Sequence, residues 1–401
     1  MDSSDDSGSR LSTKARHWYV KAAVILFDTL ALLLFVNVLL YAIFYVRDET
    51  KPAPPALIQL YGAKIYKAYS GWRPEDVYSL LKETWTKLRP EYEPFTGFRE
   101  PAFRGKFVNI HPAGFRVSRH QASWPPRSDT TSLFVFGGST TFGYGLPDDE
   151  TIASYLGECV PASSSSGRLA VYNFARASYF SSQELILFQQ LLAGGFLPQL
   201  AVFIDGVNDS YFPDGEPEYT DRLRPFMAGT LPPRPFAKVA MVRAAHWLRE
   251  RWTKPKPEPT ANYADPLALQ AIADRWVANK KMIQTIADRF GVKTVFVWQP
   301  SPTYKYDLRY HLFYDSDRVF GSHIRSRYGY ALMESMWAQG KLGPNVLWLA
   351  GIQEDKRENL YVDAMHYNAA FSSEIAGRIC DFLHENPSVP RERIRDAARQ
   401  H

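Results

Sequence analysis

The sequence predicts a three-layer α/β domain with a parallel sheet, preceded by one transmembrane helix. An apolar run from Ala22 to Val46 is long enough to cross a bilayer at about 1.5 Å per residue. From residue 131 onwards, short continuous apolar runs alternate with helical patterns, as in a parallel sheet that is buried on both faces. With 401 residues and 45% hydrophobic content, the chain can bury a sizeable core.

The charges around the apolar run predict its orientation. Basic residues precede it, whereas those that follow it stand beside acidic ones: Arg10, Lys14, Arg16 and Lys21 come before, and Arg47, Asp48, Glu49 and Lys51 after. This asymmetry predicts a cytoplasmic tail over residues 1–21, an anchor over 22–46 and an extracytoplasmic remainder, periplasmic if the host has two membranes. A cleaved signal peptide fits less well, because the run is too long and no small-residue cleavage site follows.

Asp28 lies inside this span, where a carboxylate is costly. Two interpretations stay open. Asp28 contacts a partner membrane protein, or it is protonated or lies near the headgroups.

A linker and lead-in segment covers residues 47–130. It contains a helical pattern over 75–87 and a hairpin pattern over 106–117. The main domain is predicted over 131–385 and is followed by a C-terminal tail over 386–401.

The main domain contains five predicted strands and the helices between them. The strands are predicted at 133–136, 169–174, 200–204, 293–298 and 346–349, and the helices at 152–160, 183–192, 266–290 and 370–383. Asp148 or Asp149 is the expected cap of the first of these helices.

Two long insertions, 210–262 and 301–345, follow the carboxyl ends of predicted strands. Open α/β sheets bind ligands at that edge, so the insertions are expected to be lids or substrate grooves, with a purely structural elaboration as the alternative.

A serine directly follows the first predicted strand, in the sequence Gly137-Gly138-Ser139. Small residues allow the chain to turn sharply and to place the serine hydroxyl above the sheet edge, where a nearby base would make it nucleophilic. A simple turn is the alternative. A phosphate-binding loop is excluded, because no Gly-Lys-Ser/Thr sequence follows.

The base and its partner are predicted from Asp363 and His366, which follow the fifth strand. One tight turn can place the Asp363 carboxylate against one ring nitrogen and leave the other facing a hydroxyl. Asn208 follows the third strand, where its amide can donate to an oxyanion. An Asx turn is the alternative for Asn208. Asp205 and Asp209 flank it and are expected to accept backbone N–H groups.

These sequence blocks resemble those of the SGNH, or GDSL-like, hydrolase superfamily over about residues 131 to 385. Gly138-Ser139 is similar to the first block, with Gly-Gly-Ser in place of Gly-Asp-Ser. Gly206-Val207-Asn208-Asp209 is similar to the Gly-x-Asn-Asp block, and Asp363-x-x-His366 to the last. The resemblance implies a flavodoxin-like fold and ester or acyl chemistry without metal or cofactor.

The same resemblance implies an oxyanion hole formed by the Ser139 N–H, the Ser178 N–H and the Asn208 amide. Ser178 stands where the family usually has a glycine, so it must adopt a backbone conformation that glycine accepts without a Cβ penalty.

Two cysteines are too few for a disulfide scaffold or a structural zinc site. In a sheet of this type the first and last helices share one face, which places Cys159 and Cys380 near the amino edge. They form either a disulfide or two buried thiols. The histidines share no metal-ligand spacing, and His311 is expected at the surface. Gln299 either faces the cleft or caps a strand end.

The net charge is only +5 and the basic residues are spread along the chain without a basic patch with interleaved aromatics, which gives no support for nucleic-acid binding. The leading hypothesis is a membrane-anchored serine esterase that acts on an O-acyl, for example O-acetyl, ester of an envelope polysaccharide or a lipid. An O-acyltransferase with the same triad is the first alternative. A non-catalytic binding or assembly factor is the second.

Overall fold

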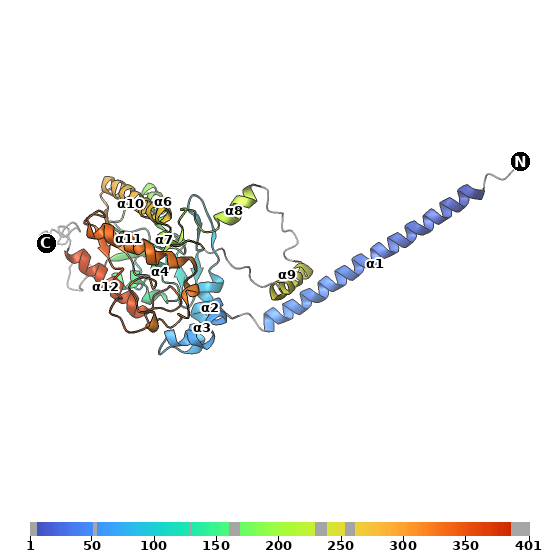
Figure 1. Cartoon of the computed structure of the whole chain (residues 1–401), viewed down its shortest axis with the longest axis horizontal. Coiled ribbons are helices and arrows are strands. Elements are labelled where there is room, and N and C mark those ends of the chain that lie inside the picture. Colours follow the sequence, from blue (N-terminus) through green and yellow to red (C-terminus); the bar gives the residue numbers. More distant parts are fainter. Residues whose placement is uncertain are drawn as a thin grey trace. The chain divides into compact units, whose positions relative to one another are not determined.

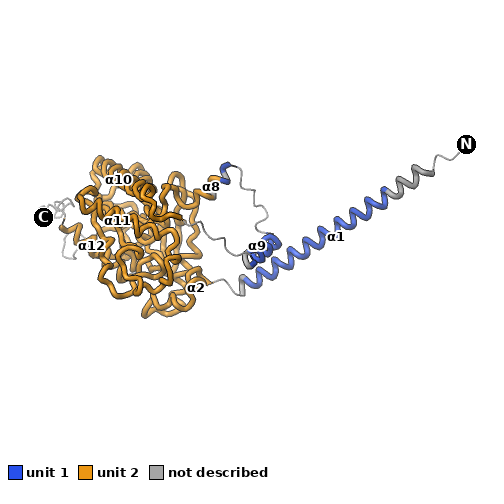
Figure 2. The backbone as a smooth tube through the Cα atoms, in the orientation of Figure 1, with its two compact units in different colours: residues 1–53, 225–260 blue, residues 54–224, 261–401 orange. Residues whose placement is uncertain are grey.

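The structure, a computed structural model, describes residues 6–50, 54–127, 130–159, 169–228, 239–252 and 261–385. The chain divides into two compact units (Figure 2). One unit comprises residues 1–53 and 225–260, and the other comprises residues 54–224 and 261–401. The second contains the predicted catalytic residues Ser139, Asp363 and His366 and is called the catalytic unit for that reason.

A five-stranded parallel sheet forms the centre of the catalytic unit. Its strands are β5 (Ser132–Gly137), β6 (Ala170–Asn173), β7 (Leu200–Asp205), β8 (Lys293–Trp298) and β9 (Val346–Trp348). They lie in the order β6-β5-β7-β8-β9, which is the flavodoxin-like order, and every neighbouring pair is parallel. The predicted fold class is confirmed.

Helices cover both faces of this sheet (Figure 1). One face carries α5 (Ile152–Leu156) and α12 (Ala369–Glu385), and the other carries α6 (Ser181–Ala193), α10 (Pro266–Arg289) and α11 (Ser326–Ala338). Successive strand residues point to opposite faces, so the sheet separates two cores. The α5–α12 face is mainly aliphatic and includes Leu133, Val135, Val202 and Ile204. The opposite face is mainly aromatic and includes Phe134, Phe136, Phe203 and Phe296.

Cys159 and Cys380 form a disulfide between the end of α5 and helix α12, with their Cα atoms 5.7 Å apart. Of the two alternatives that the sequence left open, the structure has the bridge. Disulfides form and persist mainly in oxidising compartments, which include the cell exterior and the bacterial periplasm.

The lead-in segment is folded onto the catalytic unit. Its elements are α2 (Ala56–Tyr61), η1 (Gly62–Ala68), α3 (Pro74–Lys82), η2 (Glu83–Lys87), β1 (Glu91–Glu93), β2 (Gly97–Arg99), β3 (Phe103–Arg104) and β4 (Asn109–Ile110). Their buried side chains form one cluster with Phe142, Leu146 and Val362, which flank the predicted catalytic segments.

The predicted hairpin over 106–117 is confirmed around its turn, although residues 109–110 also pair with β3 as β4. Ile110 and Arg116 form an antiparallel bridge, the His111 N–H donates to Phe115 O at 2.8 Å, and the Val117 N–H donates to Asn109 O at 2.9 Å. Arg116 also bridges Asn173 at the end of β6, so this segment continues towards the edge of the main sheet.

The predicted cap of α5, Asp148 or Asp149, is wrong. Thr151 occupies that position and accepts a hydrogen bond from the Ser154 N–H, at 3.2 Å. Asp148 lies in the preceding turn, η3 (Asp148–Glu150), where it pairs with the buried Arg116.

Short helices complete the catalytic unit at the carboxyl edge of the sheet and in the insertions. They are α4 (Ser139–Phe142), α7 (Val207–Tyr211), α8 (Thr220–Met227, whose last residues fall in the other unit), η4 (Leu308–Tyr310) and η5 (Asp317–Arg325).

The other unit contains α1 (Asp6–Thr50) and α9 (Ala240–Trp252), which pack against each other. Residues Ala15–Arg47 of α1 are long and apolar enough to cross a membrane, with a mean hydropathy of 2.5. Asp28 lies on α1, and its partner stays a prediction.

Candidate active site

The structure brings Ser139, His366 and Asp363 together in one hydrogen-bonded chain. The His366 Nδ1–H donates to Asp363 Oδ2 at 2.7 Å, and His366 Nε2 accepts from the Ser139 hydroxyl at 2.9 Å. Ser139 and His366 are 227 residues apart in the sequence. This is the geometry in which a neutral imidazole can remove the serine proton as the serine attacks.

Asp363 is held so that it remains a carboxylate. Its Oδ1 accepts the backbone N–H groups of Met365 and His366, each at 2.8 Å. Burial acts to raise the pKa of the Asp363 carboxyl, but His366 and these N–H donors outweigh it, so the pKa lies below its ordinary value. A charged Asp363 accepts the His366 Nδ1–H and so favours the tautomer whose Nε2 faces Ser139, and it would stabilise an imidazolium if His366 took up a proton.

Two aromatic rings fix the orientation of the His366 imidazole. Tyr144 stacks on it with ring centroids 5.7 Å apart, and Trp85 meets it edge-on at the same distance. Trp85 comes from the lead-in segment. Sequence reasoning had recognised Trp85 only as one of the apolar positions of a helix.

The turn before the nucleophile requires glycine at two positions. Gly137 has a φ of 156°, and a Cβ there would lie 2.4 Å from Thr141 Oγ1. A Cβ at Gly138 would lie 2.3 Å from Asn208 Nδ2. The Gly-Gly-Ser sequence therefore lets the Asn208 amide approach the nucleophile turn closely.

Three donors face the side of the turn where an oxyanion would form. Ser139 is the first residue of α4, where a backbone N–H has no acceptor within the helix. Ser178 adopts a left-handed backbone with φ 57°, as its replacement of glycine predicted. One Asn208 amide hydrogen is donated to Tyr179 O at 2.7 Å, which leaves the second for a ligand. Ser139, Ser178 and Asn208 line the same cavity.

The lead-in segment holds the loop that carries Ser178. Glu100, which is buried, accepts the Ala177 N–H at 2.7 Å. The Tyr179 hydroxyl donates to Phe98 O at 2.5 Å, and Arg176 pairs with Glu93. Burial raises the pKa of the Glu100 carboxyl, although the Ala177 N–H and Arg176 oppose the effect. These contacts on both sides of Ser178 keep its strained backbone in place.

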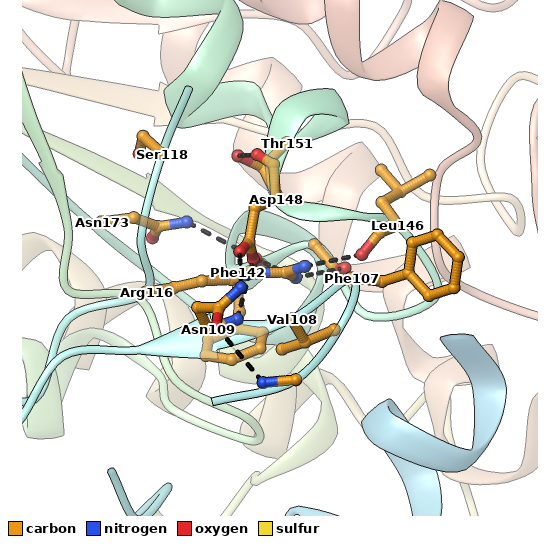
Figure 3. A network of polar contacts seen from close by, with 12 residues as sticks. Phe107, Val108, Asn109, Arg116, Ser118, Phe142, Leu146, Asp148, Thr151 and Asn173 are labelled. Atoms are coloured by element: carbon orange, nitrogen blue, oxygen red, sulfur yellow. Dashed lines mark hydrogen bonds and ion pairs between the residues drawn. The ribbon is translucent and has the colours of Figure 1, made fainter. Parts of the chain in front are cut away.

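A buried arginine holds the other side of the nucleophile turn (Figure 3). The side chain of Arg116 is 0% exposed, and its Nε donates to Asp148 at 3.0 Å. Its two terminal nitrogens donate to the carbonyls of Phe142, Gly143 and Leu146 at 2.6–2.9 Å. These carbonyls follow Ser139 directly, so Arg116 fixes the end of α4. Sequence reasoning missed Arg116, because a lone arginine in a loop is usually exposed.

The triad opens into a cavity of about 240 Å³. Its lining combines the lead-in segment with both insertions, and includes Trp85, Tyr211, Phe212, Glu218 and His323. Three of these residues, Tyr211, Phe212 and Glu218, also line a second cavity of about 390 Å³ that is formed by residues 211–221. Burial, with a smaller effect of His366, lowers the pKa of His323 to about 4. His323 is therefore a neutral group facing the nucleophile at ordinary pH.

The flanking aspartates do not join the triad. Asp209 accepts from the Ser181 hydroxyl at 2.6 Å and from the Gly206 N–H at 3.4 Å, as expected for a residue that satisfies backbone donors. Asp205 instead accepts from the Trp276 indole N–H at 2.9 Å. Burial raises the pKa of both carboxyls.

Two other polar residues near the site have structural contacts. Gln299 is 2% exposed and accepts hydrogen bonds from Thr140 and Tyr367, so it lies behind the nucleophile turn. The expectation that His311 lies at the surface is wrong. Its ring is 3% exposed, stacks on Tyr361, and hydrogen-bonds Ala364 O beside the triad aspartate. Burial lowers the pKa of His311 to about 4.

Within the described residues, no group of three or more His, Cys, Asp and Glu side chains is arranged to hold a metal ion. No family model matches the sequence, and no curated protein matches it either.

Several solved structures are similar to this chain. A carbohydrate acetylesterase from Sinorhizobium meliloti is 12% identical with a TM-score of 0.35, and the match covers 64% of this chain and 99% of that chain. An acetylxylan esterase from Geobacillus stearothermophilus, in a catalytic mutant form, is 12% identical with a TM-score of 0.34, covering 63% and 93%. An arylesterase-like protein from Agrobacterium tumefaciens is 11% identical with a TM-score of 0.36, covering 64% and 99%.

Others among the matched structures are described as acylhydrolases or as a member of the G-D-S-L lipolytic family, which is the class of protein that the sequence blocks resemble.

Proposed function

We propose that this chain is a membrane-anchored serine esterase that removes an O-acyl group, such as O-acetyl, from an envelope polysaccharide or a lipid. The observation that carries the proposal is the continuous hydrogen-bonded chain from Asp363 through His366 to Ser139, which opens into a cavity at the carboxyl edge of the sheet. Ser139, His366 and Asp363 are the proposed nucleophile, base and orienting acid.

The reaction follows from the positions of the atoms. Ser139 Oγ attacks the ester carbonyl carbon while its proton passes to His366 Nε2, and the carbonyl oxygen becomes an oxyanion beside the Ser178 N–H and the Asn208 amide. His366 then gives this proton to the departing alkoxide, which leaves an acyl group on Ser139. A water molecule that loses its proton to His366 then attacks the acyl-enzyme. His366 gives this proton to Ser139 Oγ as the acyl–Oγ bond breaks, which releases the carboxylic acid and restores the free serine.

Two features support an extracytoplasmic position for the catalytic unit. The Cys159–Cys380 disulfide is the kind of bond that persists in oxidising compartments. Helix α1 has the length and hydropathy of a membrane span, and the excess of basic residues before it favours a cytoplasmic N-terminus.

The second cavity favours an O-acyltransferase as the other candidate function. Its residues 211–221 adjoin the triad cavity and include Tyr211, Phe212 and Tyr219, whose rings can stack on a sugar acceptor. A sugar hydroxyl in that cavity would replace water in the second half of the reaction. The same triad and oxyanion hole serve both reactions.

The test uses full-length protein in detergent with p-nitrophenyl acetate, beside the variants Ser139→Ala and Ser335→Ala. Ser335 is exposed on α11, so its substitution controls for handling of a serine variant. Turnover that is lost in Ser139→Ala and kept in Ser335→Ala is expected. Equal rates for all three proteins would refute Ser139 as the nucleophile. Addition of an acceptor glycan, with mass spectrometry of both products, then separates transfer from hydrolysis.

A further inference from the structure

Helix α1 is exposed along its apolar stretch except on one stripe. Of the residues from Ala15 to Arg47, only Val36, Asn37, Leu40 and Phe44 are half-buried. Their spacing of three or four residues puts them on one face of the helix, over about 12 Å at 1.5 Å per residue. This stripe lies in the carboxyl-terminal half of the predicted span.

Helix α9 covers the stripe within the same unit. Ala240 at its start is 3% exposed, and a small residue there allows the two helices to approach closely. The Met241 N–H donates to Asn37 Oδ1 at 3.2 Å, and the Arg243 guanidinium lies 4.5 Å from the centre of the Phe44 ring.

The bond to Asn37 gives a polar residue of an apolar span a specific partner. Met241 lies in the first turn of α9, where backbone N–H groups have no acceptor within the helix. In hydrocarbon an unsatisfied N–H costs several kcal/mol, so a donor there requires an acceptor. Asn37 lies nine residues before Val46, which is about 14 Å along α1 and within half of a hydrocarbon core of about 30 Å.

The rest of α9 has the composition of a helix at a membrane surface. Trp247, Leu248 and Trp252 are 47%, 43% and 82% exposed. Helix α9 itself has three arginines against one glutamate, and the sequence around it, residues 225–260, has seven Lys and Arg against two Asp and Glu. Tryptophan is enriched at membrane interfaces, and basic residues on an amphipathic helix are attracted to anionic lipids.

We propose that α9 is embedded in the extracytoplasmic leaflet of the bilayer that α1 spans, docked on α1 through Asn37, with anionic lipid as the partner of its exposed face. This inference rests on the proposed membrane anchoring. In the sequence, α9 is inserted between the cavity-lining residues 211–221 and helix α10.

The first test measures depth in the membrane. Full-length protein is reconstituted in vesicles of phosphatidylcholine with a minority of phosphatidylglycerol, and carries one nitroxide label at Leu248→Cys or Trp252→Cys. The native cysteines are joined in a disulfide, so the label reacts only at the introduced thiol. Controls are Leu39→Cys on the exposed side of α1 and Asp288→Cys on the exposed side of α10. Accessibility to oxygen and to a water-soluble nickel chelate is compared.

Labels at positions 248 and 252 are expected to resemble Leu39→Cys, with high oxygen and low nickel accessibility, whereas Asp288→Cys shows the reverse. Nickel accessibility at 248 and 252 equal to that at 288, with Leu39→Cys protected, would overturn the proposal and leave the anchor intact. Low accessibility to both oxygen and the nickel chelate at 248 and 252 would show that protein, not lipid, contacts these positions, and it would overturn the proposal. Nickel accessibility at Leu39→Cys would overturn the anchor itself.

The second test removes the acceptor on α1. Asn37→Leu is expected to speed amide hydrogen exchange over residues 240–244 at least about tenfold in the same vesicles, because the first turn of α9 loses its partner. Asn37→Gln, which keeps the amide, is expected to recover part of the protection. Unchanged exchange in Asn37→Leu would overturn Asn37 as the docking point.

Discussion

Replacing Arg116 by methionine is expected to destabilise the catalytic unit strongly. Arg116 makes four hydrogen bonds in a site with no solvent exposure, one to Asp148 and three to carbonyls of the turn after Ser139. Methionine fills much of the same volume but donates none of these bonds.

The expected loss is about 3–5 kcal/mol, the range for removing one partner of a buried ion pair. The three carbonyls that lose their donor increase this loss of stability. A group left fully unsatisfied costs about 1–3 kcal/mol, but the three effects are not expected to add fully, because the groups share one network. A loss of this size is a large share of the 5–15 kcal/mol that stabilises a typical domain. Asp148 keeps only its two bonds from Asn109, at 2.8 and 3.1 Å.

The loss of stability in Arg116→Met is also expected to depend on pH. Burial already raises the pKa of the Asp148 carboxyl, and the Arg116 charge opposes this effect. Without Arg116 the folded-state pKa rises further above the unfolded value. A carboxyl of that kind contributes stability at low pH that is lost as the pH rises through its folded-state pKa. Arg116→Met should therefore lose more stability near neutral pH than in mild acid, and the double variant with Asp148→Asn should recover part of the loss.

The assay is urea unfolding of full-length protein in detergent micelles, followed by circular dichroism. Arg119→Met is the matched control, because Arg119 is 34% exposed and forms an ion pair with Glu158 that is worth less than about 1 kcal/mol. Arg116→Lys keeps the charge but has fewer donors, so an intermediate loss is expected. Equal midpoints for Arg116→Met and Arg119→Met would refute the role assigned to the buried network.

Three further predictions concern the triad, the oxyanion hole and the core. Asp363→Asn should lower kcat about 10⁴-fold, because an amide N–H facing His366 Nδ1 stabilises the wrong tautomer; a loss below about tenfold in the p-nitrophenyl acetate assay would contradict this. Asn208→Ala should lower kcat about 10²–10³-fold with little change in KM, whereas an effect on KM alone would assign Asn208 to substrate binding. Burial, and then Asp205, raises the pKa of Glu184, so the wild-type protein loses stability as the pH rises through that folded-state value. Glu184→Gln should remove the part of this dependence that comes from Glu184, up to about 1.4 kcal/mol per pH unit. Urea unfolding of wild type and variant in mild acid and mild base measures it, and an equal change in stability with pH in both proteins would contradict the prediction.

The strands were predictable because they are buried on both faces. Each is a continuous apolar run bounded by polar or turn residues, and β8 begins and ends at the predicted residues, Lys293 and Trp298. Ser139, Asn208, Asp363 and His366 were predictable because each follows a strand or precedes a helix at the same edge of the sheet. Parallel topology alone brings such positions together.

The side chains that support the site were not predictable from one sequence. Glu100 and Arg116 belong to a segment without strong periodicity, and Trp85 was predictable only as an apolar position of a helix. Their partners lie far along the chain; the bond from Ala177 to Glu100, for example, spans 77 residues. A charged residue in a loop predicts solvent exposure, which fails for Glu100 and Arg116 because each has hydrogen-bond partners inside the fold. The same reasoning misplaced His311.

The buried contacts of the lead-in segment hold Ser178 in a strained backbone conformation. A left-handed serine costs about 1–2 kcal/mol relative to an ordinary backbone conformation, and glycine would avoid that cost. The loop nevertheless stays in place, because the preceding N–H is bound by the buried Glu100 and the following Tyr179 is bound by Phe98 O and Arg176. Glycine would give the donor freedom to move, whereas a serine held on both sides presents its N–H in one position. The lead-in segment therefore supports the proposed oxyanion hole, and the strain at Ser178 is offset by contacts that lie outside the resembling blocks.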